Sequence, residues 1–306
     1  MMIHLEGINK TYFNGAPLHV LKGIDLDIEK GEMVSIMGAS GSGKSTLLNI
    51  LGILDTYDTG TYTLNGQLIR NLSETRAAEL RNRMIGFIFQ SFNLISFKNA
   101  MENVALPLYY QGISRKKRNA MALEYLDMVG LKDWAEHMPN EMSGGQKQLL
   151  NLASIMAMQP SVLILDEPTS QLDPIAAADF LATLGKINRE LGTTVVLTEH
   201  RLEDAFLLAS RVAVMDRGRL LCTGSPAEVG AILRGAGHSM FLAMPTPMRI
   251  WASAPDAGGH CPVTVREGRD WLTGFADGHP LGELPAESRH VYPDEPAITA
   301  EGLWFK

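Results

Sequence analysis

The stretch from Gly38 to Ser45 reads GASGSGKS, follows the apolar run MVSIM and precedes TLLNIL. A strand, a G-x-x-x-x-G-K-[ST] loop and a helix in this order are typical of a phosphate-binding loop, whereas a chance glycine-rich turn lacks this context. The glycines allow backbone N–H groups to surround phosphate oxygens, and the helix N-terminus adds positive potential. The predicted ATP-binding residues here are Gly38, Ser40, Gly41, Gly43, Lys44, Ser45 and Thr46.

Two adjacent carboxylates follow a second apolar run, VLILDEP. Asp166 is predicted to bind Mg²⁺ together with the Ser45 hydroxyl, while Lys44 is predicted to contact the β- and γ-phosphates. Glu167 is predicted to act as the general base toward the attacking water. A DE pair alone is more often a solvated corner, but a phosphate-binding loop upstream favours the catalytic interpretation.

The segment SGGQ, residues 143–146, precedes a helix. Ser143 and Gln146 fit a capping box, which satisfies the first N–H groups of a helix. Capping does not explain two glycines in a first turn, where they are costly. Close approach of a phosphate to the exposed N–H groups would explain Gly144 and Gly145, and one turn can serve both purposes.

The order of elements predicts an α/β fold with buried parallel strands. Short β segments fill residues 1–70, and a mainly helical stretch from about 73 to 158 is broken by an apolar run at 84–90. The runs at 162–166 and 194–200 flank a helix expected from about 174 to 191, as in a buried parallel sheet. Gly, Pro, Ser and His accumulate from about 231 onward, so 231–296 is interpreted as a connecting segment or C-terminal extension.

Composition limits the remaining possibilities. The 306 residues carry a net charge of −7, from 27 Lys+Arg against 34 Asp+Glu, which argues against a nucleic-acid partner. Two cysteines cannot build a disulfide framework, which favours a reducing cytosol. No signal peptide or membrane-spanning run is visible, so any spanning helices are expected from a partner.

The motifs occur in one order: the phosphate-binding loop, Gln90 after an apolar strand, MSGGQ, LILDEP, SQLD and TEH ending at His200. This order resembles the nucleotide-binding subunits of ABC transporters over about residues 2–230. The resemblance implies an ATPase on the cytoplasmic face of the membrane that couples ATP hydrolysis to transport through a separate permease. It also implies a head-to-tail dimer of ATPase domains and the cofactors ATP and Mg²⁺. The fold it implies is an α/β P-loop NTPase of ABC type, which has a mixed sheet core, a β subdomain and a helical subdomain.

The resemblance further implies individual roles. Tyr12 would stack on adenine, Gln90 would touch Mg²⁺, and His200 would hold the γ-phosphate. Asp173 would act across the dimer, and the segment Ser143, Gly144, Gly145 and Gln146 would close on the ATP of the opposite subunit. The expected domains are a nucleotide-binding domain at 1–230, with its helical subdomain at about 91–158, and the extension at 231–296.

The two halves resemble different classes of the family. The first half is similar to macrolide exporters and lipoprotein-release ATPases. The second half, including LTEHRLED, is similar to the first domain of double ATPases from energy-coupling-factor importers. A hybrid chain and a single divergent family both fit, and the direction of transport stays open.

The last residues, ITAEGLWFK at 298–306, align with IHLEGINKT at 3–11. We therefore expect 297–306 to be the first strand of a truncated second nucleotide-binding domain. Two further alternatives remain at this point: an ABC ATPase of translation or DNA repair, and a catalytically weak truncated or hybrid chain that binds ATP.

Overall fold

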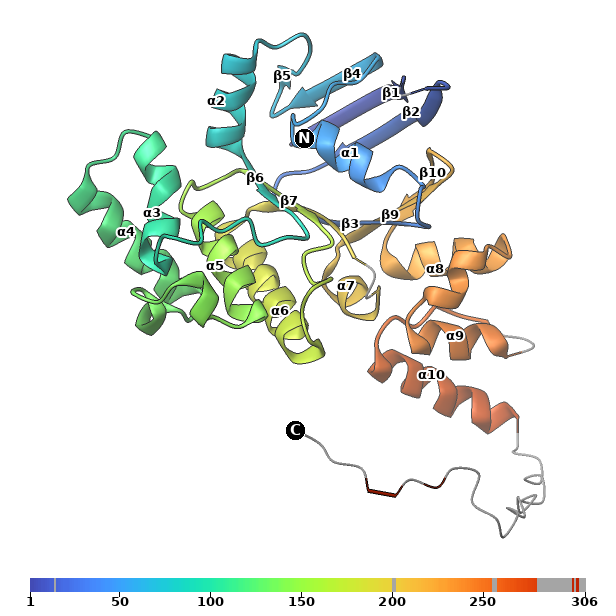
Figure 1. The fold of residues 1–306 in the computed structure, drawn as a ribbon. Helices are drawn as coiled ribbons and strands as arrows, with labels where there is room; N and C mark the ends of the chain where they lie inside the picture. Colours follow the sequence, from blue (N-terminus) through green and yellow to red (C-terminus); the bar gives the residue numbers. More distant parts are fainter. Residues whose placement is uncertain (14, 200–201, 255–257, 280–298, 300, 303–306) are drawn as a thin grey trace.

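Two β-sheets and the helices that cover them make up the computed structural model, which describes residues 1–13, 15–199, 202–254, 258–279, 299 and 301–302 (Figure 1). The larger sheet has six strands in the order β10-β9-β3-β8-β7-β6. Their bounds are Arg219–Gly224, Arg211–Asp216, Met33–Gly38, Thr194–Thr198, Val162–Asp166 and Ile85–Ile88. All neighbours pair in parallel except β10 and β9, so the sheet is mixed as expected.

Alternating side chains of the large sheet enter two different cores. Val34 and Ile36 of β3 face α1 (Lys44–Leu51) and the smaller sheet. Met33 of β3 and Val195 and Leu197 of β8 face α5 (Gly144–Met156) and α6 (Pro174–Leu191). Because both faces are covered, the central strands are continuous apolar runs. Their carboxyl ends, where ligands bind in open α/β sheets, all point to one edge.

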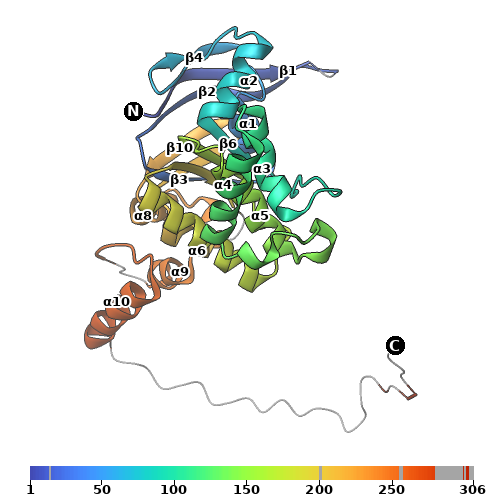
Figure 2. The same ribbon diagram turned by 90° about the vertical axis from the view of Figure 1, so that its left-hand side faces the viewer.

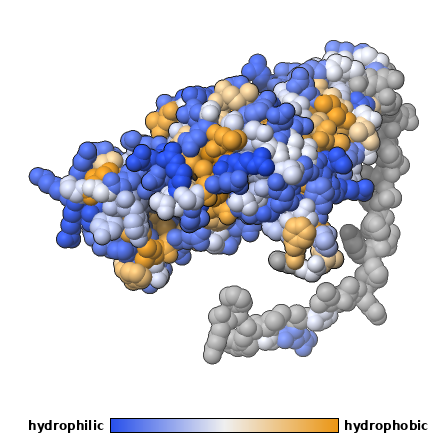
Figure 3. All heavy atoms as spheres, turned by 90° about the horizontal axis from the view of Figure 1, so that it is seen from above, coloured by the Kyte–Doolittle hydropathy of each residue, from blue (hydrophilic) through white to orange (hydrophobic). Residues whose placement is uncertain are grey.

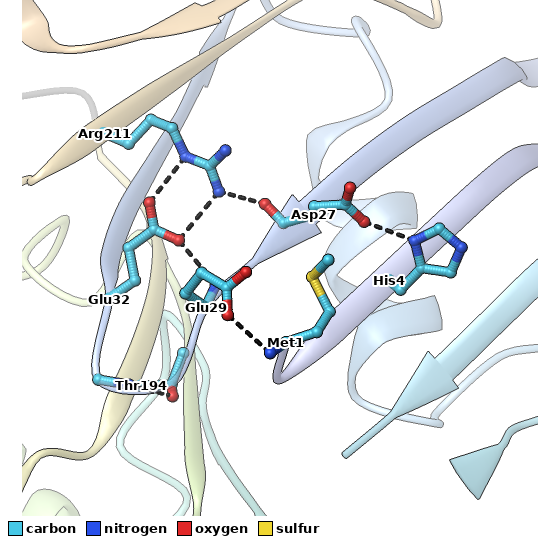
Figure 4. A network of polar contacts seen from close by, with 8 residues as sticks. Met1, His4, Asp27, Glu29, Glu32, Thr194 and Arg211 are labelled. Carbon is cyan, nitrogen blue, oxygen red and sulfur yellow. Dashed lines mark hydrogen bonds and ion pairs between the residues drawn. The ribbon is translucent and has the colours of Figure 1, made fainter. Parts of the chain in front are cut away.

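The smaller sheet is antiparallel, with the strand order β2-β1-β4-β5. These strands span Leu18–Ile28, Ile3–Tyr12, Thr59–Leu64 and Gln67–Leu68. A network of polar contacts joins this sheet to the larger one (Figure 4). Arg211 of β9 pairs with Glu32 at 2.8 Å and donates to the Asp27 carbonyl of β2. The β subdomain expected from residues 1–70 is therefore anchored at the start of β3 and β9.

Helix α2 (Glu74–Met84) packs with Ala77 and Leu80 against the core shared by the smaller sheet and α1, and the helical region beyond it is built by α3 (Ala100–Tyr110) and α4 (Arg115–Met128). This region also contains the short 3-10 helices η1 (Lys132–Trp134) and η2 (Pro139–Glu141). Val104, Leu108, Leu126 and Leu150 form its own core with α5. Gly130 takes φ +74 just after α4, which is the helix stop expected from the sequence.

The segment after β10 is more structured than its composition suggested. It contains α8 (Pro226–Gly235), η3 (Ser239–Ala243), α9 (Thr246–Ser253) and α10 (Val265–Gly278). Met248 and Trp251 are buried in one cluster with Phe206 of α7 (Leu202–Leu208). Figure 2 shows α9 and α10 at the opposite end of the molecule from the smaller sheet. Sequence periodicity missed these helices because each buries few residues, and α10 (14 residues) buries none.

The strand expected at 297–306 falls almost entirely outside the described residues. Among the residues that the structure does describe, no helix is long and apolar enough to cross a membrane. The face seen from above in Figure 3 is mainly hydrophilic, with hydrophobic residues in separate patches.

Candidate nucleotide site

The glycine-rich loop lies at the carboxyl end of β3 and leads directly into α1. Gly41 and Gly43 have φ values of +76 and +101, a region that residues with a side chain rarely adopt. A Cβ at Gly38 would meet the Met215 carbonyl oxygen at 2.5 Å. Gly43 caps α1 without any side-chain hydrogen bond. The first N–H groups of α1 are thus directed into the loop, where they suit an anion.

Lys44 lies folded back within this loop. Its Nζ donates to the carbonyl oxygens of Gly38 at 2.8 Å and Ala39 at 3.1 Å. Burial lowers the pKa of the Lys44 ammonium, while the charges of Glu167 and Asp166 act in the opposite direction. The predicted loop residues Ser40 and Ser45 are exposed, and Thr46 follows in the first turn of α1. The loop therefore presents a cation, hydroxyls and N–H groups to one place.

Asp166 ends β7 beside the loop, as the sequence predicted. Its Oδ1 accepts from the Thr198 hydroxyl at 2.8 Å and from the Ser45 hydroxyl at 3.3 Å. Parallel pairing of β7 and β8 places Asp166 opposite Thr198. A carboxylate and a hydroxyl are hard oxygen donors of the kind that Mg²⁺ takes when phosphate oxygens supply further ligands. No group of three or more His, Cys, Asp or Glu residues suited to a metal ion occurs within the described part of the chain.

Glu167 occupies a strained position at the same edge. Its φ of 48° lies in the left-handed region, which costs a non-glycine residue of order 1–3 kcal/mol. The Glu167 N–H donates to both the carbonyl and the hydroxyl oxygen of Thr198 at 3.1 Å. Gln90, two residues beyond β6, donates from Nε2 to Glu167 Oε2 at 2.7 Å. Gln90 is thus placed against the predicted general base.

The SGGQ segment forms the predicted capping box at the start of α5. The Ser143 N–H donates to Gln146 Oε1 at 2.9 Å, and the Gln146 N–H donates to Ser143 Oγ at 3.3 Å. A Cβ at Gly145 would lie 2.7 Å from the Ala176 Cβ of α6, so Gly145 has a packing cause within the chain itself. At Gly144 the nearest atom would be 3.6 Å away. Close approach of a ligand thus remains an explanation for Gly144.

The remaining predicted residues lie around this edge or outside the described chain. Asp173 caps α6, and its Oδ1 accepts from the N–H groups of Ile175 and Ala176 at 3.0 Å. Tyr12 ends β1, and its hydroxyl donates to Asp55 Oδ2 at 2.7 Å. Burial, and then the hydrogen bond to Asp55, raise the pKa of Tyr12. His200 lies outside the described residues.

Sequence reasoning missed three polar residues that organise the site. Thr198 bridges Asp166 and Glu167, and it ends the apolar run TVVLT, which was a usable signal. Glu199, only 5% exposed, accepts from the Thr169 N–H at 3.1 Å and hydroxyl at 2.8 Å, tying the ends of β7 and β8 together. Asp55 binds Tyr12 across 43 residues of sequence, and no local pattern marks it.

Comparison with known proteins identifies this arrangement. The ABC transporter family matches residues 21–170. YknY, an uncharacterized ABC transporter ATP-binding protein of Bacillus subtilis (strain 168), is 44% identical over 230 residues, 75% of this chain and all of that protein. The lipoprotein-releasing system ATP-binding protein LolD of Pseudoalteromonas translucida is 41% identical over 72% of this chain and 95% of its own length.

A solved structure agrees. The ATP-binding cassette MJ0796, in a dimeric post-hydrolysis state with ADP and Pi, superimposes with a TM-score of 0.68 at 38% identity. The match covers 73% of this chain and 98% of that one. The predicted fold class and ATPase activity are confirmed. The chain belongs to the ABC transporter family, as an ATP-binding and ATP-hydrolysing subunit.

Proposed function

We propose that two such domains close head to tail around two ATP molecules, with Mg²⁺, and drive a separate membrane permease. The observation that carries this proposal is the meeting of Lys44, Ser45, Asp166 and Glu167 at one sheet edge. Within this chain, the SGGQ turn lies against Leu172 and against Ala176 of α6. A second ATPase domain would bring its SGGQ turn to this chain's ATP, with Asp173 acting across the dimer.

Ser45 and Asp166 would hold Mg²⁺, with Gln90 beside them, as their oxygen donors fit this ion. When bound, the ion neutralises charge on the phosphates. Glu167 is the general base that polarises the attacking water, and Thr198 fixes its backbone. Gln90 donates to the Glu167 carboxylate at 2.7 Å, a bond that would have to open for Gln90 to touch Mg²⁺. His200 would contact the γ-phosphate. Most of the catalysis is positioning and charge neutralisation.

The permease would dock on the helical region near the Gln90 loop. Three aromatic side chains are exposed there: Phe97 at 77%, Tyr110 at 71% and Phe89 at 37%. Exposed aromatic side chains are enriched at protein interfaces. Phe89 precedes Gln90, which binds Glu167, so docking at this surface would reach the catalytic edge. The chain would then lie on the cytoplasmic face of the membrane as a peripheral subunit without a nucleic-acid partner.

We also propose that residues 1–230 form the cassette, with 91–158 as its helical subdomain, and that 231–296 form an extension. The described helices α9 and α10 belong to this extension. The named relative LolD serves lipoprotein release. We therefore propose that the coupling surface between Gln90 and the SGGQ turn is exporter-like. Export is the direction of transport to test first.

Lys44→Ala tests the nucleotide site. Loss of the buried ammonium should weaken ATP binding at least tenfold, because a charge-assisted contact to phosphate is worth roughly 1.5–3 kcal/mol. Calorimetric titration measures the dissociation constant, and Lys30→Ala, an exposed lysine before β3, is the matched control. Unchanged ATP affinity of Lys44→Ala would reject the proposed role of the loop.

Co-purification tests the partner. When membranes of cells that produce the full chain are solubilised in detergent, the chain should co-purify with an integral membrane protein. The Phe97→Asp variant should lose this association. Leu242→Asp, which is equally exposed at 77% but lies in η3, is the control and should retain it. Equal retention of both variants would place the docking surface elsewhere.

A further inference from the structure

A partly buried polar network fixes the side chain of Tyr12. Asp55 lies in the loop between α1 and β4 and uses both carboxylate oxygens. Its Oδ1 accepts from the Lys10 ammonium at 2.7 Å and from the Thr56 N–H at 2.7 Å. Its Oδ2 accepts from the Tyr12 hydroxyl at 2.7 Å. One carboxylate therefore holds two side chains of β1.

Lys10 adds to the same arrangement. It is only 7% exposed, and its Nζ also donates to the Thr56 carbonyl at 2.6 Å. The ammonium lies 5.0 Å from the centroid of the Tyr12 ring, within cation–π range. One side of the ring is thus occupied by the cation, which leaves the other side for a flat partner.

The ionisation of the network agrees with this geometry. Burial alone would raise the pKa of Asp55, but the hydrogen bonds from Lys10, Tyr12 and the Thr56 N–H hold it below its ordinary value. Asp55 is therefore a carboxylate at neutral pH, and its bonds to Lys10 and Tyr12 are charge-assisted and strong. A buried lysine with such a partner is held in one position.

We propose that Asp55 is a positioning residue for the adenine base: it anchors the Tyr12 hydroxyl and the Lys10 ammonium, and so fixes the ring on which adenine stacks. This inference rests on the proposed role of Tyr12 in the ATP site. Flat aromatic surfaces bind bases by stacking, which needs a defined ring plane. The loop that carries Asp55 follows α1, whose N-terminus serves the phosphates. Base and phosphate recognition are joined through one helix.

The test compares ATP with inorganic tripolyphosphate, which has the phosphates but no base. Tyr12→Phe keeps the ring and removes the anchor, so calorimetry should show ATP affinity about threefold to tenfold lower. Tripolyphosphate affinity should stay unchanged. Asp55→Ala should reproduce this pattern, and adding Tyr12→Phe to it should cost little more, because both remove the same contact.

Tyr57→Phe is the matched control. It also removes one tyrosine hydroxyl, from the loop that carries Asp55. The Tyr57 hydroxyl donates to the Ile69 carbonyl at 2.7 Å and not to Asp55. It should leave both affinities unchanged. If Asp55→Ala does not fold, the comparison of Tyr12→Phe with Tyr57→Phe still decides the question.

Tyr12→Ala separates failure of this inference from failure of the site. Loss of the whole ring should weaken ATP binding about fivefold to a hundredfold. If Tyr12→Ala weakens ATP binding but Tyr12→Phe does not, Asp55 does not position the ring. If Tyr12→Ala has no effect, the adenine contact itself is wrong. If the losses also appear with tripolyphosphate, the network acts on the phosphate site and the inference is overturned.

Discussion

Replacing Trp251 with Ala tests whether the helices after β10 belong to the core of the cassette. Trp251 of α9 is 5% exposed and packs in one cluster with Phe206 of α7 and Met248. Its indole N–H donates to the Gly258 carbonyl at 3.4 Å, and the Arg234 guanidinium lies 4.3 Å from the ring centroid. Removing a buried tryptophan creates a cavity and costs about 3–5 kcal/mol.

Urea unfolding followed by circular dichroism measures this loss. The free energy of unfolding should fall by about 3–5 kcal/mol in the same transition that unfolds the rest of the chain. Leu242→Ala in η3, where the side chain is 77% exposed, should change it by less than about 0.5 kcal/mol. A loss below about 1 kcal/mol, or a separate early transition that alone shifts, would refute the reasoning. The helices after β10 would then unfold independently of the cassette.

Two further predictions concern packing and pH. Gly145→Ala should lower the free energy of unfolding by about 1–3 kcal/mol, because its Cβ would lie 2.7 Å from that of Ala176. Gly144→Ala, the control, should leave the free energy of unfolding nearly unchanged. Equal urea midpoints for the two variants would contradict the packing explanation for Gly145. Burial raises the pKa of the Cys261 thiol from 9.0 to about 11, so the contribution of the neutral thiol to stability is complete below pH 9, and roughly 2 kcal/mol of it is lost as pH rises from 9 through 11. The stability difference between wild type and Cys261→Ala should shift by this amount from pH 8 to 11, and a constant difference would contradict the burial.

Local patterns predicted much of the site because its chemistry depends on short spacings. GASGSGKS, VLILDEP and SGGQ each combine an element boundary with functional residues, and the structure places each at the expected end of β3, β7 or α5. The helix expected at 174–191 matches α6, since Asp173, Pro174 and Gly192 mark its ends. Element boundaries of this kind are encoded within a few residues of chain.

Contacts between distant residues could not be predicted in the same way. Asp55 and Tyr12, Thr198 and Asp166, and Gly145 and Ala176 are brought together only by folding. Gly145 shows the consequence: a ligand appeared to be the natural reason for the glycine, but a neighbouring helix supplies a second one. The helices of the extension were missed because their buried faces consist of only a few residues each.

We propose that Glu167 acts as the general base for ATP hydrolysis within a head-to-tail dimer. Glu167→Gln keeps the shape of the side chain and its position beside Gln90 but removes the base. With ATP and Mg²⁺, light scattering should show a mass of twice 33.5 kDa, while turnover falls roughly 10²- to 10⁴-fold. A variant that stays monomeric with ATP, or that turns over at near the wild-type rate, would contradict the account.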